Sequence, residues 1–320
     1  MTDVLLTVTR SNVTLSNMIA VEDRIERLNT ASARKVINPD TDVAGHIGDG
    51  QLLPDELLSI VGLDLDLTPE QKVKLSREEI ASITDAGIRF EAILTAGFAL
   101  QIATTRGSVA DPRVEYLLHE IGEESRHSRL FARLHAQCAP TAPNPFDRKL
   151  LHHVMRWGTM RIISLPSLLY TLVLAGEEIP DLIQKLASEH PDTDPFIRAV
   201  NKYHRLEEAR HLSYARAVLP EIWAEASIAE KVAVRRVAPF VIRGMFETLV
   251  QPGVYAAIGL PAWDTWKKVN KTPERIALRH QALRPVLKAL LDAGVFRGGR
   301  VNKGWRDLCG VDATGEPLAA

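Results

Sequence analysis

The sequence predicts an all-α protein: a bundle of long helices, preceded by an arm and followed by further helices. Helix start signals, in which a capping residue precedes a proline, occur at Thr68-Pro69, at Asp111-Pro112 and before Pro195, where Asp192 or Asp194 is the cap. The segments after them have apolar residues at helical spacing. They show little of the alternating β-branched pattern of strands, so helices packed on helices are expected.

Composition excludes several classes of protein. The 320 residues suffice for one large core with appended elements, and the formal net charge of −1 provides no field for nucleic acid or anionic lipid. Cys138 and Cys309 form no CxxC pair, so neither a disulfide framework nor a thiolate metal site is expected. Residues 1–12 lack the features of a secretory leader. We therefore expect a soluble, cytoplasmic protein without a nucleic-acid partner.

The longest uncharged stretch, Ile162 to Gly176, does not predict a membrane span. It has 15 residues and contains Pro166, whereas a spanning helix needs ~20 apolar residues. We expect this stretch to be a buried helix and the protein to have no membrane partner.

The first part of the chain divides into an arm and the start of a core. Residues 1–67 contain scattered turn signals and one short amphipathic stretch around Val21 to Leu28, which is typical of a wrapping arm. A four-helix core is expected over residues 68–220. Its first helix should run from Thr68 to about Thr105, and its second from Asp111 to near Cys138.

The rest of the core and the C-terminal part are also predicted to be helical. A third helical region covers about Asp147 to His190, with a break at Pro166 and a disturbance at Pro180. The fourth helix is expected to end before Pro220. Residues 221–320 contain more helical pattern and should pack on the same domain.

Two segments of similar sequence, residues 120–127 and 204–211, each contain the pair Glu-x-x-His. Residues three apart on a helix project to the same side, so such a pair can present an oxygen and a nitrogen to one metal ion. One pair is weak evidence, because Glu and His are common on exposed helix faces, but two pairs favour a metal site. The alternative is two surface helices with charge pairs such as Glu123 with His127.

Helical phase favours the second glutamate of each pair of adjacent glutamates. Glu124 shares a stripe with Leu117 and Phe131, whereas Glu123 lies on a more mixed face. In the second segment Glu207 is excluded in the same way. The residues on the apolar stripe there are His204, Glu208 and His211.

A two-metal carboxylate bundle also needs one carboxylate from each of the other two helices. Glu91 is followed by no charge until Arg106, and an unpaired buried carboxylate costs several kcal/mol, so a metal or ion-pair partner is expected, with metal favoured. Glu177 and Glu178 follow the uncharged stretch, and helical phase does not decide between them. The resulting order of ligands is that of a ferritin-like protein.

The ligand types favour iron as the metal. Four carboxylates and a bridging oxygen group nearly neutralise two ferric ions, and three imidazoles complete the ligands without adding charge. Zinc does not need so many carboxylates, and magnesium does not favour three histidines. Manganese remains an alternative to iron.

At these residues the sequence resembles the p-aminobenzoate N-oxygenase family, the di-iron arylamine oxygenases of natural-product biosynthesis. The similarity covers about residues 20 to 260. Its specific mark is an additional histidine, because the fourth helix of the family is similar to HxxxExxH instead of ExxH. The present chain has that spacing at His204, Glu208 and His211.

The resemblance implies both a ligand set and a reaction. It favours Glu177 over Glu178 through its distance to His204. The reaction it implies is O2-dependent oxidation of an amino group, of the aryl amine type, toward hydroxylamine, nitroso and nitro compounds. Two iron ions, an external electron donor such as a reductase or ferredoxin, and a homodimer are implied as well. The implied ligands are Glu91, Glu124, His127, Glu177, His204, Glu208 and His211.

Other points remain open at the level of sequence. No residue identifies a particular amine, and none beyond the metal ligands is assigned a catalytic role. Asp85 and Glu120 are candidates for hydrogen bonds to metal-bound imidazoles. The alternatives to N-oxygenation are another di-iron hydroxylase or desaturase reaction, or an iron-binding bundle without catalysis.

Overall fold

The structure is a computed structural model that describes residues 19–34 and 36–318. It confirms the all-α prediction, since helices and loops make up the described part of the chain. The one isolated β-bridge within that part joins Val311 to Pro317.

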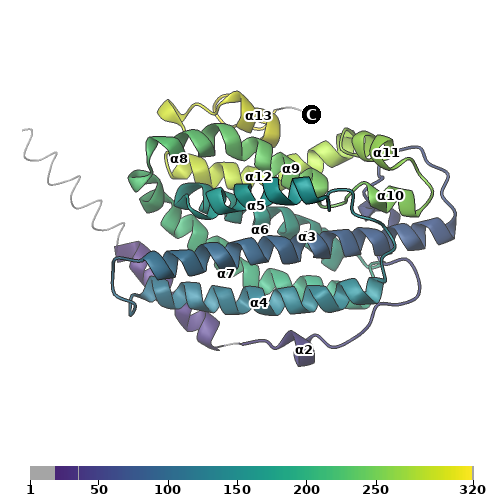
Figure 1. The fold of residues 1–320 in the computed structure, drawn as a ribbon, viewed down its shortest axis with the longest axis horizontal. Coiled ribbons are helices and arrows are strands. Elements are labelled where there is room, and N and C mark those ends of the chain that lie inside the picture. Colours follow the sequence, from purple (N-terminus) through teal and green to yellow (C-terminus); the bar gives the residue numbers. More distant parts are fainter. Residues whose placement is uncertain (1–18, 35, 319–320) are drawn as a thin grey trace, which may run out of the picture.

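Four long helices of the described chain form the core: α3 (Pro69–Thr104), α4 (Pro112–Cys138), α6 (Pro166–Glu189) and α7 (Pro195–Glu225). Helix α3 packs along α4, and α6 packs along α7 (Figure 1). The two pairs meet through contacts of α3 with α6 and of α4 with α7. This closed set of contacts is a ferritin-like four-helix bundle, whose interior can hold side chains from every helix.

The helices begin at the predicted signals. The hydroxyl of Thr68 accepts a hydrogen bond from the backbone N–H of Gln71, whose side chain accepts one from the backbone of Thr68. Asp111 caps α4. Of the two candidates before Pro195, Asp194 is the cap of α7. These local bonds fix where each core helix enters the bundle.

Two prolines affect the core helices differently. Pro166 does end the preceding helix, since α5 (Lys149–Ile163) and α6 form a pair bent by 110°. The prediction that the fourth helix ends before Pro220 is wrong, because α7 continues through this residue. An interior proline costs about 3 kcal/mol. The continuing turn offsets this cost by burying Trp223, whose indole N–H donates to the carbonyl of Gly294 at 3.2 Å.

The described part of the predicted arm runs along the outside of the core. Residues 19–34 form a helix, held to α7 by a hydrogen bond from Arg24 to the hydroxyl of Ser213 at 3.1 Å. The segment that follows contains α2 (Pro39–Asp42), which contacts α4, and the short 3-10 turn η1 (Asp55–Leu57). Residues 1–18 of the predicted arm lie outside the described residues.

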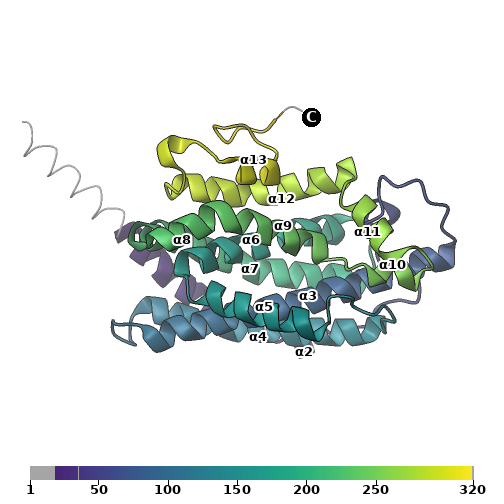
Figure 2. The same ribbon diagram turned by 45° about the horizontal axis from the view of Figure 1, so that its top comes forward.

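The C-terminal part adds a second layer of helices. Figure 2 shows α12 (Pro273–Asp292) and α13 (Lys303–Cys309) beyond α6 and α9 (Ala238–Thr248), on the side away from α4. Helix α12 contacts both α6 and α13. Cys138 and Cys309 are buried free thiols. The elements of this part are α8 (Ile228–Val232), the π-helical turn η2 (Ala233–Val237), α9 (Ala238–Thr248), α10 (Gly253–Ala257), α11 (Ala262–Val269), α12 (Pro273–Asp292), η3 (Arg297–Gly299) and α13 (Lys303–Cys309).

Among the described helices, α3 alone is long and apolar enough to cross a membrane. If the bent α5–α6 pair is counted as one span, the number of candidate spans rises to two. Both α3 and α6 pack within the bundle. The residues from Ser167 to Gly176 are all buried. The predicted uncharged helix is therefore a core helix over this part of its length.

Gly176 allows α6 to approach α3 closely. A Cβ atom placed there would overlap the ring of Phe90, so an added methyl group must displace the ring. We expect Gly176→Ala to lower the free energy of unfolding by about 1–3 kcal/mol, the usual cost of overpacking. Gly158→Ala on α5 is the matched control, because no atom lies within 4 Å of its added Cβ. Chemical denaturation that finds both variants equally stable would contradict this prediction.

Candidate metal centre

The seven predicted ligand residues come together in the interior of the bundle. Helix α3 contributes one of them, α4 two, α6 one and α7 three. None exposes more than 4% of its surface. These residues are Glu91, Glu124, His127, Glu177, His204, Glu208 and His211.

Glu124 and Glu208 lie between two imidazoles. Nδ1 of His127 is 3.6 Å from Oε2 of Glu124 and 3.0 Å from Oε1 of Glu208. Nδ1 of His211 is 3.2 Å from Oε1 of Glu124 and 2.8 Å from Oε2 of Glu208. Each carboxylate therefore directs one oxygen toward each imidazole, which is the arrangement needed to bridge two metal ions.

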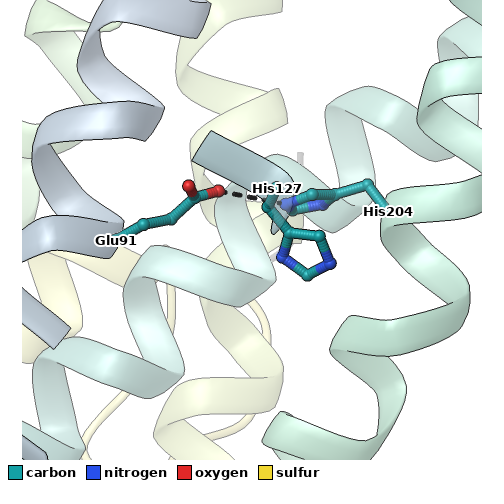
Figure 3. A group of neighbouring side chains, drawn as sticks. All are labelled: Glu91, His127 and His204. Atoms are coloured by element: carbon teal, nitrogen blue, oxygen red, sulfur yellow. Dashed lines mark ion pairs between the residues drawn. The ribbon is translucent and has the colours of Figure 1, made fainter. Parts of the chain in front are cut away.

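Glu91 and His204 extend the cluster on one side. Nε2 of His204 is 3.5 Å from Oε1 of Glu91 and 3.4 Å from Oε1 of Glu208. Figure 3 shows Glu91, His127 and His204 approaching one point from three helices, and their ligand atoms lie within 4.8 Å of one another. Nδ1 of His204 pairs with Oε1 of Gln184 at 3.0 Å, and this contact orients Nε2 toward the cluster.

The structure separates Glu177 from Glu178, which helical phase did not. Glu177 is buried, and its Oε1 has no hydrogen-bond partner among the described residues. Burial and the charges of Glu208 and Glu124 raise the pKa of Glu177 well above its ordinary value. Glu178 instead forms an ion pair with Arg216. Only Glu177 thus has a carboxylate available to the centre.

Buried polar atoms without hydrogen bonds indicate that the centre is built for a ligand. An unsatisfied buried polar group costs about 1–3 kcal/mol, and more if it is charged. A metal ion would satisfy several such groups at once, and carboxylates together with imidazoles suit iron or manganese. Among the seven predicted ligands, the side-chain atoms that make no hydrogen bond within the described chain are both oxygens of Glu124, Nδ1 of His127, Oε1 of Glu177, Nε2 of His204 and Oε1 of Glu208.

Protons on the imidazoles compensate the carboxylates when no metal is bound. Burial disfavours the charged form of His127, but the nearby carboxylates of Glu124 and Glu207 raise its pKa well above the ordinary value. The pKa of His211 is raised in the same way, chiefly by the charge of Glu208 against the effect of burial. Because a metal binds neutral imidazole, binding must release these protons. Metal affinity should therefore fall as the pH is lowered.

A second pair of glutamates orients the two imidazoles. Nε2 of His127 donates to Oε2 of Glu207 at 2.9 Å, and Nε2 of His211 donates to Oε2 of Glu123 at 2.8 Å. Each of these bonds crosses between α4 and α7. A carboxylate on the far nitrogen fixes the tautomer and the direction of a ligating ring, so both Nδ1 atoms face the centre.

Two arginines hold this second pair of glutamates. The Arg210 guanidinium lies 2.8 Å from Oε1 of Glu123 and 3.4 Å from Oε1 of Glu207. The Arg126 guanidinium lies 3.7 Å from Glu207 and 3.9 Å from Glu123. Burial opposes ionisation of Glu123, but the hydrogen bond from His211 and the charges of His211 and Arg210 lower its pKa to about 2. The repeated Glu-Glu-x-Arg-His motif thus builds one cross-linked unit from two helices.

Helical phase did not predict this unit. It assigned Glu123 to a mixed face and excluded Glu207 in the same way, whereas the structure exposes only 2% and 0% of these two residues. The signal for this unit is that both segments repeat a first glutamate and an arginine. A ligating imidazole needs a hydrogen-bond partner for its other nitrogen, and the first glutamate is that partner. The prediction that Asp85 bonds an imidazole is wrong, since Asp85 pairs with Arg89 at 3.0 Å. Glu120 does lie in the centre, beside His211.

Glu207→Gln should weaken metal binding roughly 10–100-fold, the usual effect of losing an orienting partner. The reason is that glutamine removes the charge that holds the imidazole of His127 and the guanidinium of Arg210. Glu178→Gln is the matched control, because Glu178 pairs with Arg216. Titration against a competing chelator measures both affinities. Equal affinities for the two variants would refute the orienting role.

Comparisons with known proteins agree with this geometry. The family model described as p-aminobenzoate N-oxygenase AurF matches residues 19–294. Uncharacterised proteins of Mycobacterium bovis and of two strains of Mycobacterium tuberculosis are 24% identical over 257 residues, which is 76% of this chain and 73% of each relative. No solved structure matches the chain significantly. Since the family match covers most of the sequence and every predicted ligand, the chain belongs to the p-aminobenzoate N-oxygenase family.

Proposed function

We propose that this protein is a di-iron oxygenase that uses O2 to oxidise an amino group, of the aryl amine type, toward hydroxylamine, nitroso and nitro products. The observation that carries the proposal is the group of buried carboxylates and imidazoles with unsatisfied ligand atoms, inside a bundle of this family. Two iron ions bound there would supply the binding and reduction of O2, with electrons from a separate reductase or ferredoxin.

The donors divide into two sets that share two carboxylates. The shared carboxylates would bind both metals. The first set would add two imidazoles and a lone carboxylate, and the second would add one imidazole and a lone carboxylate. The first set is Glu91, His127 and His204, the second is Glu177 and His211, and the shared pair is Glu124 and Glu208.

A cavity of about 270 Å³ lies beside the centre. Three of the proposed ligands, Glu91, Glu177 and His204, form part of its wall. An apolar cavity that excludes water keeps the reacting groups from competing hydrolysis and side reactions. A bound amine would therefore meet the iron ions on the side of His204. Apolar side chains that line the cavity include Ile83, Phe90, Phe131, Ile179, Ile183 and Val200.

A single-turnover experiment tests the proposed function. Protein loaded with ferrous iron is mixed with O2 and a set of aromatic amines, and products are identified by mass spectrometry with isotopically labelled O2. The expected product is a hydroxylamine in which a labelled oxygen atom is bonded to nitrogen. A labelled oxygen atom bonded to carbon would favour a hydroxylase instead. Iron binding without any O2 consumption would favour a passive iron-binding bundle.

A further inference from the structure

We propose that the cavity beside the centre binds an uncharged, largely apolar substrate, so that the enzyme discriminates against aromatic amines bearing a carboxylate. The identity of the reacting amino group rests on the proposed function above. The charge and size of the substrate rest on the cavity alone. They can therefore be tested without turnover.

The cavity is large enough for one substituted ring. Its volume is about 270 Å³, whereas a cavity of about 150 Å³ already accommodates benzene. Aromatic and aliphatic side chains dominate its walls, among them Phe90, Phe131 and Ile179. Contact with such walls favours apolar molecules by removing their surface from water.

The described lining of the cavity provides no free cation to pair with an anion. Glu91 and Glu177 lie in the wall that faces the centre, where their charges would offset those of bound iron. Arg89 is the only arginine or lysine among the described residues of the lining. Its side chain is 64% exposed and pairs with Asp85 at 3.0 Å, so it lies at the rim with its charge already compensated. A carboxylate inside would be desolvated without a partner, at a cost of several kcal/mol.

Most polar side chains of the lining already have partners. The hydroxyl of Thr84 donates to the carbonyl of Ile80 at 2.9 Å, and that of Thr248 donates to the carbonyl of Gly244 at 2.7 Å. Asn201 differs, because its amide makes no hydrogen bond to another described side chain or backbone group. This amide can bind a neutral group of the substrate, such as an ester, amide or hydroxyl, but it provides no charge for a carboxylate.

Anaerobic binding measurements test this proposal. Calorimetry on the iron-loaded protein compares p-aminobenzoate with its methyl ester and its amide, which differ mainly in charge. We expect each neutral compound to bind at least about tenfold more tightly than p-aminobenzoate. Asn201→Arg should narrow or reverse this preference by placing a cation in the cavity. Failure of the neutral compounds to bind more tightly than p-aminobenzoate overturns the proposal.

The same measurements keep the two proposals apart. Binding is recorded without O2, so it does not depend on the reaction. Tight binding of the ester without any oxidation on addition of O2 would contradict the proposed function and leave the substrate charge established. Oxidation of p-aminobenzoate in preference to the ester would contradict only the substrate charge.

A separate observation concerns Glu120 on α4. Glu120 lies four residues before Glu124, just as His204 lies four residues before Glu208 on α7. Its side chain is 1% exposed, and its Oε2 makes no hydrogen bond within the described chain. A carboxylate oxygen of Glu120 and the ligand atoms of Glu124 and His211 lie within 4.8 Å of one another.

The geometry points to Glu120 as an eighth ligand, for the metal that His211 would hold. Its position would match that of His204, which would bind the metal held by His127. The two metals would have equal numbers of protein ligands but different chemistry, since one carries an additional imidazole and the other an additional carboxylate. Carboxylate and imidazole differ in charge, so the two iron ions should be spectroscopically distinct.

Mössbauer spectroscopy of the diferrous protein tests this assignment. Wild type should show two ferrous components, and Glu120→Gln should alter one of them while weakening one of the two iron-binding steps at least about tenfold. Glu115→Gln is the control, because Glu115 is 62% exposed on the same helix. Unchanged spectra and affinities in Glu120→Gln overturn the assignment. So does an iron-loaded wild-type crystal structure in which Glu120 contacts neither metal.

Discussion

Glu208→Ala is expected to lose at least one of the two iron ions and all O2-dependent chemistry. Glu208 approaches three imidazoles, with Oε1 at 3.0 Å from His127 and 3.4 Å from His204, and Oε2 at 2.8 Å from His211. Removing it deletes a bridging charge and leaves these imidazoles without their shared partner. Iron per chain after anaerobic reconstitution is the measurement, followed by O2 consumption.

Comparable losses are expected for Glu124→Ala and Glu91→Ala, which remove the other bridge and a lone carboxylate of the first set. Glu225→Ala is the matched control, since Glu225 is exposed at the end of the same helix as Glu208. Full iron occupancy with normal O2 consumption in all three ligand variants would refute the assignment of the centre.

His204→Ala is expected to keep the fold and part of the iron, while the yield of oxidised amine per bound iron falls roughly 100-fold. Misplacing a reacting group produces an effect of this size. His204 lies both at the centre, 3.4 Å from Glu208, and in the wall of the cavity. The remaining donors of the first set, Glu91 and His127, still allow a metal to bind. The amine would then meet an altered iron.

The assay is hydroxylamine formed in a single turnover, expressed per bound iron so that partial metal loss does not mimic the effect. His119→Ala provides the control, because His119 is partly exposed on α4 and its imidazole pairs with Glu115 at 3.9 Å. Undiminished product in His204→Ala would show that His204 is a packed histidine without influence on the reaction. The N-oxygenase proposal would then rest on family membership.

Local signals allowed most of the fold to be predicted. Thr68, Asp111 and Asp194 form hydrogen bonds with the first turn of their own helices, so the sequence alone carries the information. The end of α7 depends instead on tertiary burial. Nothing near Pro220 reveals that the next turn packs Trp223 against the C-terminal part.

The candidate site shows the same division. Residues three apart on one helix share a face, so Glu124 with His127 could be found from spacing. Glu123 is buried by a bond to an imidazole of another helix, and the phase of one helix carries no information on its neighbour. The choice of Glu177 over Glu178 likewise depends on Arg216 of α7.

The absence of charge after Glu91 was also a weaker signal of burial than expected. Several alanines of that stretch lie exposed on α3, including Ala92, Ala96 and Ala103. Alanine is a strong helix former and exposes little apolar surface, so a run without charge can occupy an outer helix face. Glu91 is buried because of the direction of its own side chain.

Anomalous diffraction at the iron edge, from crystals of the iron-loaded wild type, tests the existence of the two-metal centre most directly. The structure predicts two peaks about 3.5–4 Å apart, the usual separation in two-metal sites. Both should lie among the carboxylates and imidazoles of α3, α4, α6 and α7, with Glu124 and Glu208 between them. A map without iron peaks there, or with Glu124 and Glu208 turned toward solvent, would contradict the account.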